Sequence, residues 1–280
     1  MNLKNIYIVI VLYKTSLAES KAIQSLNDGL ESNVNLMVFD NSPSRQYELN
    51  NFQYHHFNVN YYHDCSNPGL STAYNLALNF ATETHCKWLM LLDQDTTFTK
   101  EYLDEIKTIE KLPDSIVAVI PKVVSLIDAQ VISPAIIYLG GLLRPKNLDS
   151  GIIKYKITGI NSGTILSVAF MNTISGFDKQ YTLDMLDHWY FGKIYANKKE
   201  VFLMNNTIYQ DLSVLGNFED KVPFNRYKKM IEAEYLLNKE EGLLNLALFK
   251  LRLCFRALKQ LGFTNKAYYK STIKHILRVR

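Results

Sequence analysis

The chain has 280 residues, of which 48% are hydrophobic and 21% charged, and its formal net charge is +4. This composition excludes a disordered chain, a collagen-like repeat and a disulfide scaffold. The three cysteines, Cys65, Cys86 and Cys254, form no C-x-x-C pair, so we expect buried thiols in a reducing cytoplasm. No run reaches the roughly 18 apolar residues that a membrane span needs, and the apolar run over residues 6–13 is too short for a signal sequence.

Strands and helices alternate at short spacing over the first 120 residues. Apolar, β-rich runs predict strands over residues 6–13, 34–39, 58–62, 88–92 and 116–120. Between them we expect a helix to about Leu30 opened by a capping box of Ser16 and Glu19, a helix through Phe80, and a helix over residues 100–111. This alternation predicts a doubly wound α/β fold with a mostly parallel sheet. Residues 121–183 hold three prolines and short apolar runs, which indicates antiparallel pieces and loops.

The C-terminal part of the chain is helical in pattern and strongly basic, so we divide the chain into residues 1–222 and a helical extension, residues 223–280. From Leu243 to Arg280 there are nine Lys or Arg residues and no Asp or Glu, and the preceding residues therefore carry a net charge of −5. Such asymmetry predicts an acidic partner. An anionic membrane surface is favoured over nucleic acid, because no nucleic-acid-binding motif accompanies the charge. A solvated helical tail is the alternative.

Two carboxylates, Asp93 and Asp95, stand one residue apart at the end of the strand over residues 88–92. Residues i and i+2 of an extended chain face the same way, so both can reach one ligand. Their hard oxygens suit Mg²⁺ or Mn²⁺ held jointly with a substrate diphosphate, and a solvated acidic turn is the alternative. Asp40 and the turn Asn67-Pro68-Gly69 follow neighbouring strands and are expected at the same sheet edge, where a nucleotide would bind. Neither G-x-G-x-x-G nor a P-loop is present, which disfavours dinucleotide and P-loop enzymes.

Several motifs follow one another in order over roughly residues 5–230. They are Val9 to Tyr13, Asp40-Asn41-Ser42, Asn67-x-Gly69-x-x-x-Ala73-x-Asn75, Leu92-Asp93-Gln94-Asp95-Thr96, Ser162-Gly163-x-Ile165, Gly176-Phe177-Asp178, Leu183-Asp184-Met185-Leu186-Asp187-x-Trp189 and Phe224-Asn225-Arg226-Tyr227. Together they resemble the motifs of family 2 glycosyltransferases, which are GT-A-fold enzymes that use nucleotide-diphosphate sugars. The Asp-Gln-Asp-Thr form is similar to bacterial rhamnosyltransferases of O-antigen and capsule assembly, which favours dTDP-L-rhamnose as the donor. Galactofuranose or a hexose from a UDP donor is the open alternative.

The resemblance also implies a role for each matching residue. Asp187 aligns with the catalytic base, and Asp95, together with Asp93, is the implied ligand of Mg²⁺ or Mn²⁺. The residues implied to bind the donor nucleotide are Tyr13, Asp40, Asn67, Gly69 and Asp93, and those implied for the acceptor region are Ser162, Gly163, Asp184 and Trp189. A polyprenyl-diphosphate-linked glycan at the inner face of the cytoplasmic membrane is the acceptor that would also account for the basic C-terminus, and we expect a peripheral protein there.

The chemistry of an inverting transfer requires the same division of labour. A hydroxyl is a poor nucleophile at neutral pH, so a carboxylate such as Asp187 must take its proton, while a divalent cation stabilises the departing diphosphate. The chain departs from the family pattern at Lys14, where Asn is common, at Lys193, where Arg is usual, and at Ser213, where a His is found. Lysine lacks the planar fork of arginine. If the missing His is a metal ligand, we expect weak metal binding.

Two other classes of function stay open from the sequence alone. The run Asp93-Gln94-Asp95-Thr96-Thr97 also fits the D-x-D-x-[TV] signature of haloacid-dehalogenase-type phosphatases, in which Asp93 would be the nucleophile. That signature normally lies on the first strand, whereas about 90 residues precede it here. The other class is a non-catalytic subunit that binds a nucleotide sugar.

Overall fold

The computed structural model describes residues 1–46, 56–109, 111–210 and 218–278, and the chain divides into two compact units. Unit 1 comprises Met1–Ala135, Pro145–Thr182 and Leu186–Asp211, and unit 2 comprises Ile136–Arg144, Leu183–Met185 and Leu212–Arg280. Two short segments from earlier in the chain therefore join the C-terminal helices in unit 2. The domain boundary at residue 222 stays a prediction.

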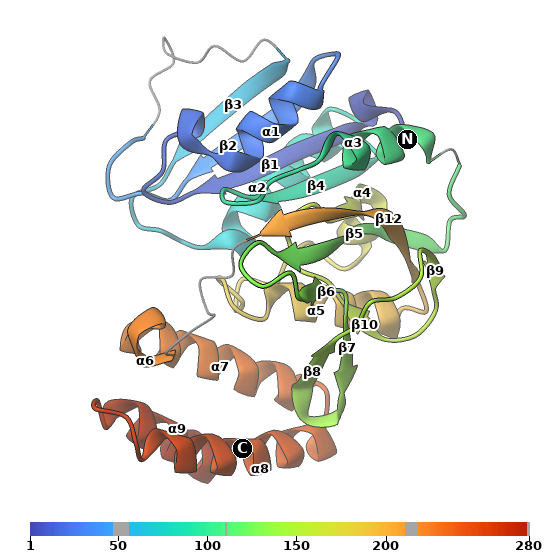
Figure 1. Cartoon of the computed structure of the whole chain (residues 1–280). Helices are drawn as coiled ribbons and strands as arrows, with labels where there is room; N and C mark the ends of the chain where they lie inside the picture. The colour runs from blue at the N-terminus through green and yellow to red at the C-terminus, as the bar shows by residue number, and fades with distance from the viewer. Residues whose placement is uncertain (47–55, 110, 211–217, 279–280) are drawn as a thin grey trace. The chain divides into compact units, whose positions relative to one another are not determined.

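Unit 1 is built on a mostly parallel sheet with the strand order β3-β2-β1-β4-β11-β5-β12-β9, and β6 pairs with β5 (Figure 1). β1 lies between β2 and β4 and is parallel to both, β3 is parallel to β2, and β12 is parallel to β5. β6, β9 and β11 are antiparallel to their neighbours. The strands of unit 1 are β1 (Ile6–Leu12), β2 (Val34–Asp40), β3 (Phe57–His63), β4 (Trp88–Asp93), β5 (Ile116–Ser125), β6 (Val131–Ser133), β9 (Gly151–Ile153), β10 (Ile157–Thr158), β11 (Ile165–Ser167) and β12 (Glu200–Gln210).

Helices cover both faces of this sheet. α1 (Lys21–Gly29) and α3 (Lys100–Thr108) share one core with the even-numbered residues of β1. α2 (Leu70–Glu83) packs on β1 and β4 at the opposite face, where Phe80 stacks on Tyr7, and α4 (Val168–Thr173) lies beside it. Because both faces are covered, β1 is buried along its whole length. The other helical segments of unit 1 are η1 (Leu3–Asn5), η2 (Leu17–Glu19) and α5 (Leu186–Ala196).

The predicted fold class, an α/β fold with a mostly parallel sheet and C-terminal helices, is confirmed. The first predicted helix is wrong in its start. The capping box of Ser16 and Glu19 closes only the short η2, and α1 begins after Ser20, whose hydroxyl accepts from the Ile23 N–H. The expectation of buried thiols is correct for Cys86 and wrong for Cys65 and Cys254, which are exposed.

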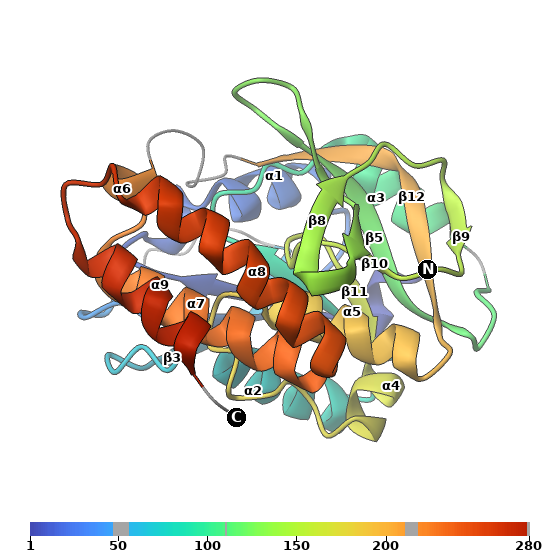
Figure 2. The same cartoon turned by 90° about the horizontal axis from the view of Figure 1, so that it is seen from below.

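Unit 2 contains three helices that pack against one another, α7 (Phe224–Glu240), α8 (Leu243–Gln260) and α9 (Ala267–Leu277) (Figure 2). The other elements are α6 (Phe218–Lys221) and η4 (Leu139–Gly141), which β7 (Ala135–Tyr138) and β8 (Leu142–Pro145) flank. In the parts of the chain that the structure describes, no helix combines the length and the apolar character needed to cross a bilayer.

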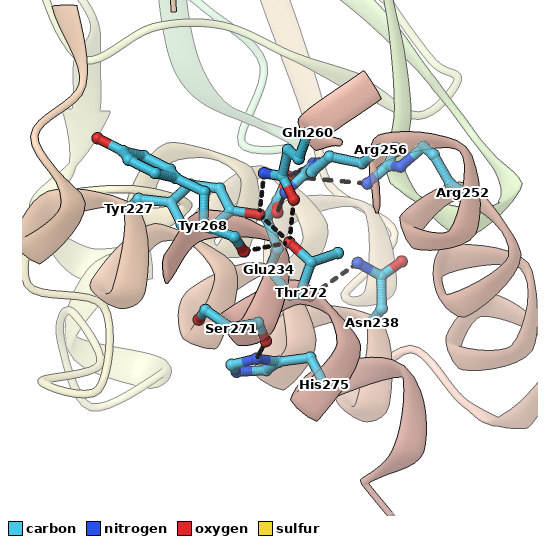
Figure 3. A network of polar contacts seen from close by, with 10 residues as sticks. All are labelled: Tyr227, Glu234, Asn238, Arg252, Arg256, Gln260, Tyr268, Ser271, Thr272 and His275. Carbon is cyan, nitrogen blue, oxygen red and sulfur yellow. Dashed lines mark hydrogen bonds and ion pairs between the residues drawn. The ribbon is translucent and has the colours of Figure 1, made fainter. Parts of the chain in front are cut away.

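A polar network ties the inner faces of these three helices together (Figure 3). Arg256 of α8 donates to both carboxylate oxygens of Glu234 on α7, at 2.6 and 2.8 Å. Gln260 of α8 donates its Nε2 to the Tyr227 hydroxyl of α7 at 2.9 Å, and its Oε1 accepts from the Thr272 hydroxyl of α9 at 2.6 Å. All three helices thus contribute to one largely buried network, which fixes their rotation about their axes.

Candidate active site

Neighbouring strands of unit 1 end in polar residues at one edge of the sheet. In the parallel register, Asp40 of β2 and Asp93 of β4 flank the end of β1. Tyr13 follows β1 directly, is 44% exposed, and donates its N–H to Gln94 Oε1 at 2.8 Å. The structure therefore brings Tyr13, Asp40 and Asp93 to the carboxyl edge, where open α/β sheets bind their ligands.

Asp40 is fully buried, and its carboxylate orders the loop that follows β2. Oδ1 accepts from the Ser42 N–H at 2.9 Å, and Oδ2 accepts from the Gln46 N–H at 2.8 Å and from the Tyr61 hydroxyl at 2.6 Å. Burial by itself raises the pKa of Asp40, but the hydrogen bonds from Ser42, Tyr61 and Gln46 outweigh it and hold the pKa below its ordinary value. Because its oxygens already accept from the chain's own donors, a contact of Asp40 with the nucleotide stays a prediction.

Asp93 and Asp95 lie within reach of one amide from a distant strand. Gln210, the last residue of β12, donates its Nε2 to Asp93 Oδ2 at 3.2 Å and to Asp95 Oδ1 at 3.4 Å. An antiparallel bridge between Thr97 and Tyr209, with N–H···O distances of 2.9 and 3.1 Å, holds β12 against the acidic loop. Burial and then the charge of Asp95 raise the pKa of Asp93 to about 7. The amide therefore moderates the repulsion between the two carboxylates without removing it.

Ser162 and Gly163 are buried directly beside this loop. The Ser162 hydroxyl accepts from the Asp93 N–H at 3.1 Å and shares a hydrogen bond of 2.6 Å with the Thr96 hydroxyl. Gly163 donates its N–H to the Leu91 carbonyl at 2.8 Å. These contacts make Ser162 and Gly163 positioning residues for the acidic loop, and their predicted place in the acceptor region stays a prediction.

The motif that begins at Asn67 fastens α2 to the segment that precedes α5. Gly69 has φ +95°, and a Cβ at this position would lie 2.3 Å from the Thr182 carbonyl oxygen, so only glycine allows this approach. Asn75 holds the Phe177 backbone from both sides, donating to its carbonyl at 2.7 Å and accepting from its N–H at 2.8 Å. Asn67 itself is exposed, with φ 51°. Nucleotide contacts by Asn67 and Gly69 stay predictions.

Asp187, the predicted base, lies in the first turn of α5, where the helix dipole favours a negative charge. Its side chain keeps 17% exposure, and its Oδ1 accepts from the His188 N–H at 2.8 Å. The His188 ring is held by a hydrogen bond of 2.7 Å between its Nδ1 and the Thr158 hydroxyl. The charge of Asp187 contributes to the raised pKa of Asp93. The base and the acidic loop therefore belong to one electrostatic site.

Two buried tyrosines lie in the field of these carboxylates. Burial, followed by the charge of Asp93 for Tyr74 and of Asp187 for Tyr190, raises the pKa of both phenols well above the ordinary value. The Tyr74 hydroxyl is fully buried and has no hydrogen-bond partner among the residues that the structure describes. A buried donor left unpaired beside acidic groups indicates a position that a bound molecule would complete.

The remaining predicted residues have local partners. Trp189 is 5% exposed and packs against Tyr181, with ring centroids 6.2 Å apart, and Lys193 Nζ lies 5.3 Å from the Trp189 ring centroid. Asp184 belongs to unit 2, where Arg226 contacts its Oδ1 at 3.4 Å. The acceptor roles of Trp189 and Asp184 stay predictions. Ser213, where the family has a His, lies outside the described residues.

The acidic loop fits a divalent cation that is held partly by its substrate. Within the described ranges, no cluster of three or more His, Cys, Asp or Glu side chains is arranged to hold a metal, which leaves the pair Asp93 and Asp95. Mg²⁺ is commonly bound by one or two carboxylates together with substrate phosphates. A cation would relieve the repulsion that raises the pKa of Asp93. The Gln210 amide presents its Nε2 and not its oxygen to both carboxylates, so in this arrangement it is not a metal ligand.

Sequence reasoning missed Gln210 and Tyr74. The apolar run over residues 201–204 predicts a strand, but the polar residues 205–207 that follow it give no indication that this strand continues to Gln210. Tyr74 stands between the motif residues Ala73 and Asn75, and an aromatic residue in a helix gives no sign that its hydroxyl is unpaired.

Comparison with known proteins identifies the family to which this chain belongs. The sequence profile of Glycosyl transferase family 2 matches residues 7–160, which is more than half of the chain. The chain belongs to this family, and the predicted class of enzyme, a glycosyltransferase, is confirmed. No curated protein matches the sequence.

The phosphatase alternative is wrong, since Asp93 ends β4 instead of the first strand of such a fold, and the family match likewise favours an enzyme over a non-catalytic subunit.

Solved structures share the GT-A fold at low sequence identity. GalNAc-T7 with UDP, GalNAc and Mn²⁺ is 10% identical, with a TM-score of 0.59 over 83% of this chain and 48% of that chain, so this protein spans about half of its length. TarS 1-349 from S. aureus in complex with UDP-GlcNAc is 15% identical, with a TM-score of 0.56 over 97% of this chain and 81% of that one. The mannosyltransferase PcManGT from Pyrobaculum calidifontis, in complex with GDP-Man and Mn²⁺, is 8% identical, with a TM-score of 0.53 over 97% and 73%.

Proposed function

We propose that this protein is an inverting, metal-dependent glycosyltransferase that moves L-rhamnose from dTDP-L-rhamnose to a hydroxyl of a lipid-linked glycan precursor. The observation that carries the proposal is the pair Asp93 and Asp95 at the carboxyl end of β4, bridged by the Gln210 amide, with Asp187 at the start of α5 near enough for its charge to contribute to the raised pKa of Asp93. This arrangement supplies a pair of carboxylates suited to Mg²⁺ or Mn²⁺ and a separate carboxylate suited to act as a base.

The carboxylates have different tasks in the transfer. Asp93 and Asp95 would hold a divalent cation, which supplies positive charge to the departing diphosphate. Asp187 takes the proton of the acceptor hydroxyl while that oxygen attacks the anomeric carbon. The bond from this carbon to the diphosphate oxygen breaks on the opposite face, so the configuration inverts. The His188 N–H, bound to Asp187 Oδ1, orients the base for this step.

The choice of donor is supported by the Asp-Gln-Asp-Thr form of the acidic loop. In this loop the Thr96 hydroxyl forms a buried hydrogen bond with the Ser162 hydroxyl, so the threonine of the motif stabilises the conformation of the loop. The alternative donor is a UDP-sugar carrying galactofuranose or a hexose, and TarS is seen with UDP-GlcNAc. Both donors present a diphosphate to Asp93 and Asp95, and they differ in the base and the sugar.

The acceptor we propose is a polyprenyl-diphosphate-linked glycan at the cytoplasmic face of an anionic membrane, of the kind extended in O-antigen or capsule assembly. The support is the segment from Leu243 onward, which has nine basic residues and no acidic ones. The protein would then work in the cytoplasm as a peripheral membrane protein, with no nucleic acid partner.

Calorimetric titration with dTDP and with UDP, each with and without Mn²⁺, tests the donor. We expect metal-dependent binding with preference for dTDP. A preference for UDP would keep the glycosyltransferase and change the donor, and the absence of binding to either nucleotide would contradict the proposed site.

Asp187→Asn tests the base. We expect turnover to fall by about 10²–10⁴-fold, the usual contribution of a general base, while dTDP affinity is retained. Near-normal turnover in this variant would show that Asp187 is not the base.

A further inference from the structure

The outer side of α8 carries a row of exposed apolar side chains. Five large members, each at least 55% exposed, lie within α8: Leu243, Leu244, Leu251, Phe255 and Leu258; Leu261, at 52%, follows the helix directly. Leu244, Leu251, Phe255 and Leu258 are separated by steps of seven, four and three residues, which keep positions on one side of a helix. We call this row the apolar stripe. Large apolar side chains gathered at this density on a surface mark a contact with a partner or a membrane.

The apolar stripe is not the face that packs inside unit 2. Phe249 and Leu253 are fully buried in the core that α8 shares with α7 and α9. Arg256 and Gln260, on the adjoining side of α8, reach Glu234 and Tyr227 of α7 (Figure 3). With its inner face fixed in this way, α8 directs the apolar stripe away from α7.

α9 has lysines on the side opposite to the one that packs inside unit 2. Tyr268 and His275 of α9 face inward, where the Tyr268 hydroxyl donates to the Val222 carbonyl at 2.6 Å and His275 Nε2 contacts a Glu232 oxygen of α7 at 3.0 Å. The opposite side of α9 carries what we call the lysine row, three exposed side chains at intervals of four residues: Lys266, Lys270 and Lys274. Figure 2 shows α8 and α9 side by side in front of α7.

Eight of the nine cations of the C-terminal segment lie in the described residues, and they divide into two groups. Arg252, Arg256 and Arg278 pair with glutamates of α7 at 3.9, 2.6 and 2.7 Å. Lys250 donates to the Arg278 carbonyl and Lys266 to the Leu261 carbonyl, each at 2.6 Å. Three exposed lysines remain for an outside partner, and they are Lys259, Lys270 and Lys274.

We propose that the helix pair α8–α9 lies flat on an anionic phospholipid surface, with the apolar stripe inserted at the level of the acyl chains and the lysine row against the phosphates. A helix with one apolar and one cationic side binds at the membrane interface both by burying apolar surface and by electrostatic attraction to anionic lipids. The inference deepens the proposed function, since the lipid-linked acceptor would be held at the same surface.

The charge pattern selects a membrane over a second copy of the chain. A two-fold dimer pairs the same patch on both subunits. Pairing the apolar stripe in this way would bring two cationic surfaces together, because Lys259 directly follows Leu258 of the stripe, the lysine row belongs to the neighbouring helix α9, and no acidic residue follows Leu243. An anionic bilayer instead matches both the apolar and the cationic part.

Co-sedimentation of the full-length protein with vesicles tests the proposal. The vesicles are mixed phosphatidylglycerol and phosphatidylcholine in one series and phosphatidylcholine alone in the other. The stripe variant is Leu251→Ser/Phe255→Ser, and the lysine variant is Lys270→Gln/Lys274→Gln. Ile127→Ser is the control, because Ile127 is 67% exposed but belongs to unit 1. Helix content and Tm identify any variant that fails to fold.

We expect partition onto anionic vesicles to fall at least about tenfold in the stripe variant and to be unchanged in the control. The lysine variant is expected to lose binding to anionic vesicles and most of its salt dependence. Undiminished binding of the folded stripe variant would overturn the proposal. A dimer in sedimentation equilibrium that the stripe variant abolishes, with vesicle binding unchanged, would assign the surface to a second copy and also overturn it.

Titration of the same variants with dTDP and UDP separates the two proposals. Retained nucleotide binding without vesicle binding would overturn the membrane surface alone. Vesicle binding by a protein that binds neither nucleotide would support the membrane surface and contradict the proposed function alone.

Discussion

Replacing Asp93 by Asn tests the electrostatics of the acidic loop without any substrate. Burial and the charge of Asp95 raise the pKa of Asp93 from an ordinary 3.8 to about 7. Between these values the folded protein keeps a proton on Asp93 that the unfolded chain has lost, so stability falls as pH rises through this window. A shift of about three pKa units corresponds to at most about 4 kcal/mol of unfolding free energy at pH 8. Asn at this position has no proton to lose and removes the effect.

Urea unfolding at pH 5 and pH 8, in EDTA, measures the difference. Because about two of the three pKa units of this window lie above pH 5, we expect the stability of Asp93→Asn relative to the wild type to rise by up to about 2.7 kcal/mol between pH 5 and pH 8. Mn²⁺ is expected to stabilise the wild type at pH 8 more than the variant, since in the proposed site Asp93 is a ligand of the metal in the folded state. The same dependence of stability on pH in both proteins would refute the reasoning.

Three further predictions concern single side chains. Asp95→Ala is expected to weaken Mn²⁺-dependent nucleotide binding at least about tenfold in calorimetry, and unchanged affinity would remove Asp95 from the metal site. Gly69→Ala places a Cβ 2.3 Å from the Thr182 carbonyl oxygen and is expected to cost about 1–3 kcal/mol or more in urea unfolding. Gly242→Ala is the matched control, because Gly242 also has a positive φ but no atom lies within 4 Å of an added Cβ. Equal losses of stability in both variants would show that backbone strain, and not the contact with Thr182, causes the loss. Glu234→Gln breaks a buried ion pair with Arg256 and is expected to cost about 3–5 kcal/mol, and stability near that of the wild type would contradict the network in Figure 3.

The sequence was sufficient to predict the sheet and the edge at which the acidic residues meet. Buried parallel strands read as continuous apolar runs, and their carboxyl ends share one edge, so Asp40 and Asp93 could be placed there before any coordinates. The burial of Asp40 could not be predicted in this way. It depends on Tyr61, from a strand whose alternation in the sequence is weak, and on the N–H of Gln46 in the following loop.

Gln210 shows a second limit of the sequence. Its contact with the acidic loop depends on the register of β12 with β5 and on the bridge from Tyr209 to Thr97, which joins segments more than 100 residues apart. The nine basic residues of the C-terminal segment could be counted from the sequence, but their partners could not be predicted. Charge in a sequence does not show that Arg252, Arg256 and Arg278 are used inside unit 2, while Lys270 and Lys274 are exposed.

The proposed metal site and the proposed membrane surface both contain like charges, but only at the metal site are these charges held in an unfavourable arrangement. At the acidic loop, Asp93 and Asp95 are held close together, and their repulsion is only moderated by the Gln210 amide. A site that stores like charges in the folded protein gains most when a cation arrives with a diphosphate, because binding removes an existing unfavourable interaction. Along α9 the like charges are solvated and cost little until an anionic surface is near. Metal and donor binding should therefore depend steeply on pH between 6 and 8, whereas vesicle binding by the lysine row should depend steeply on salt.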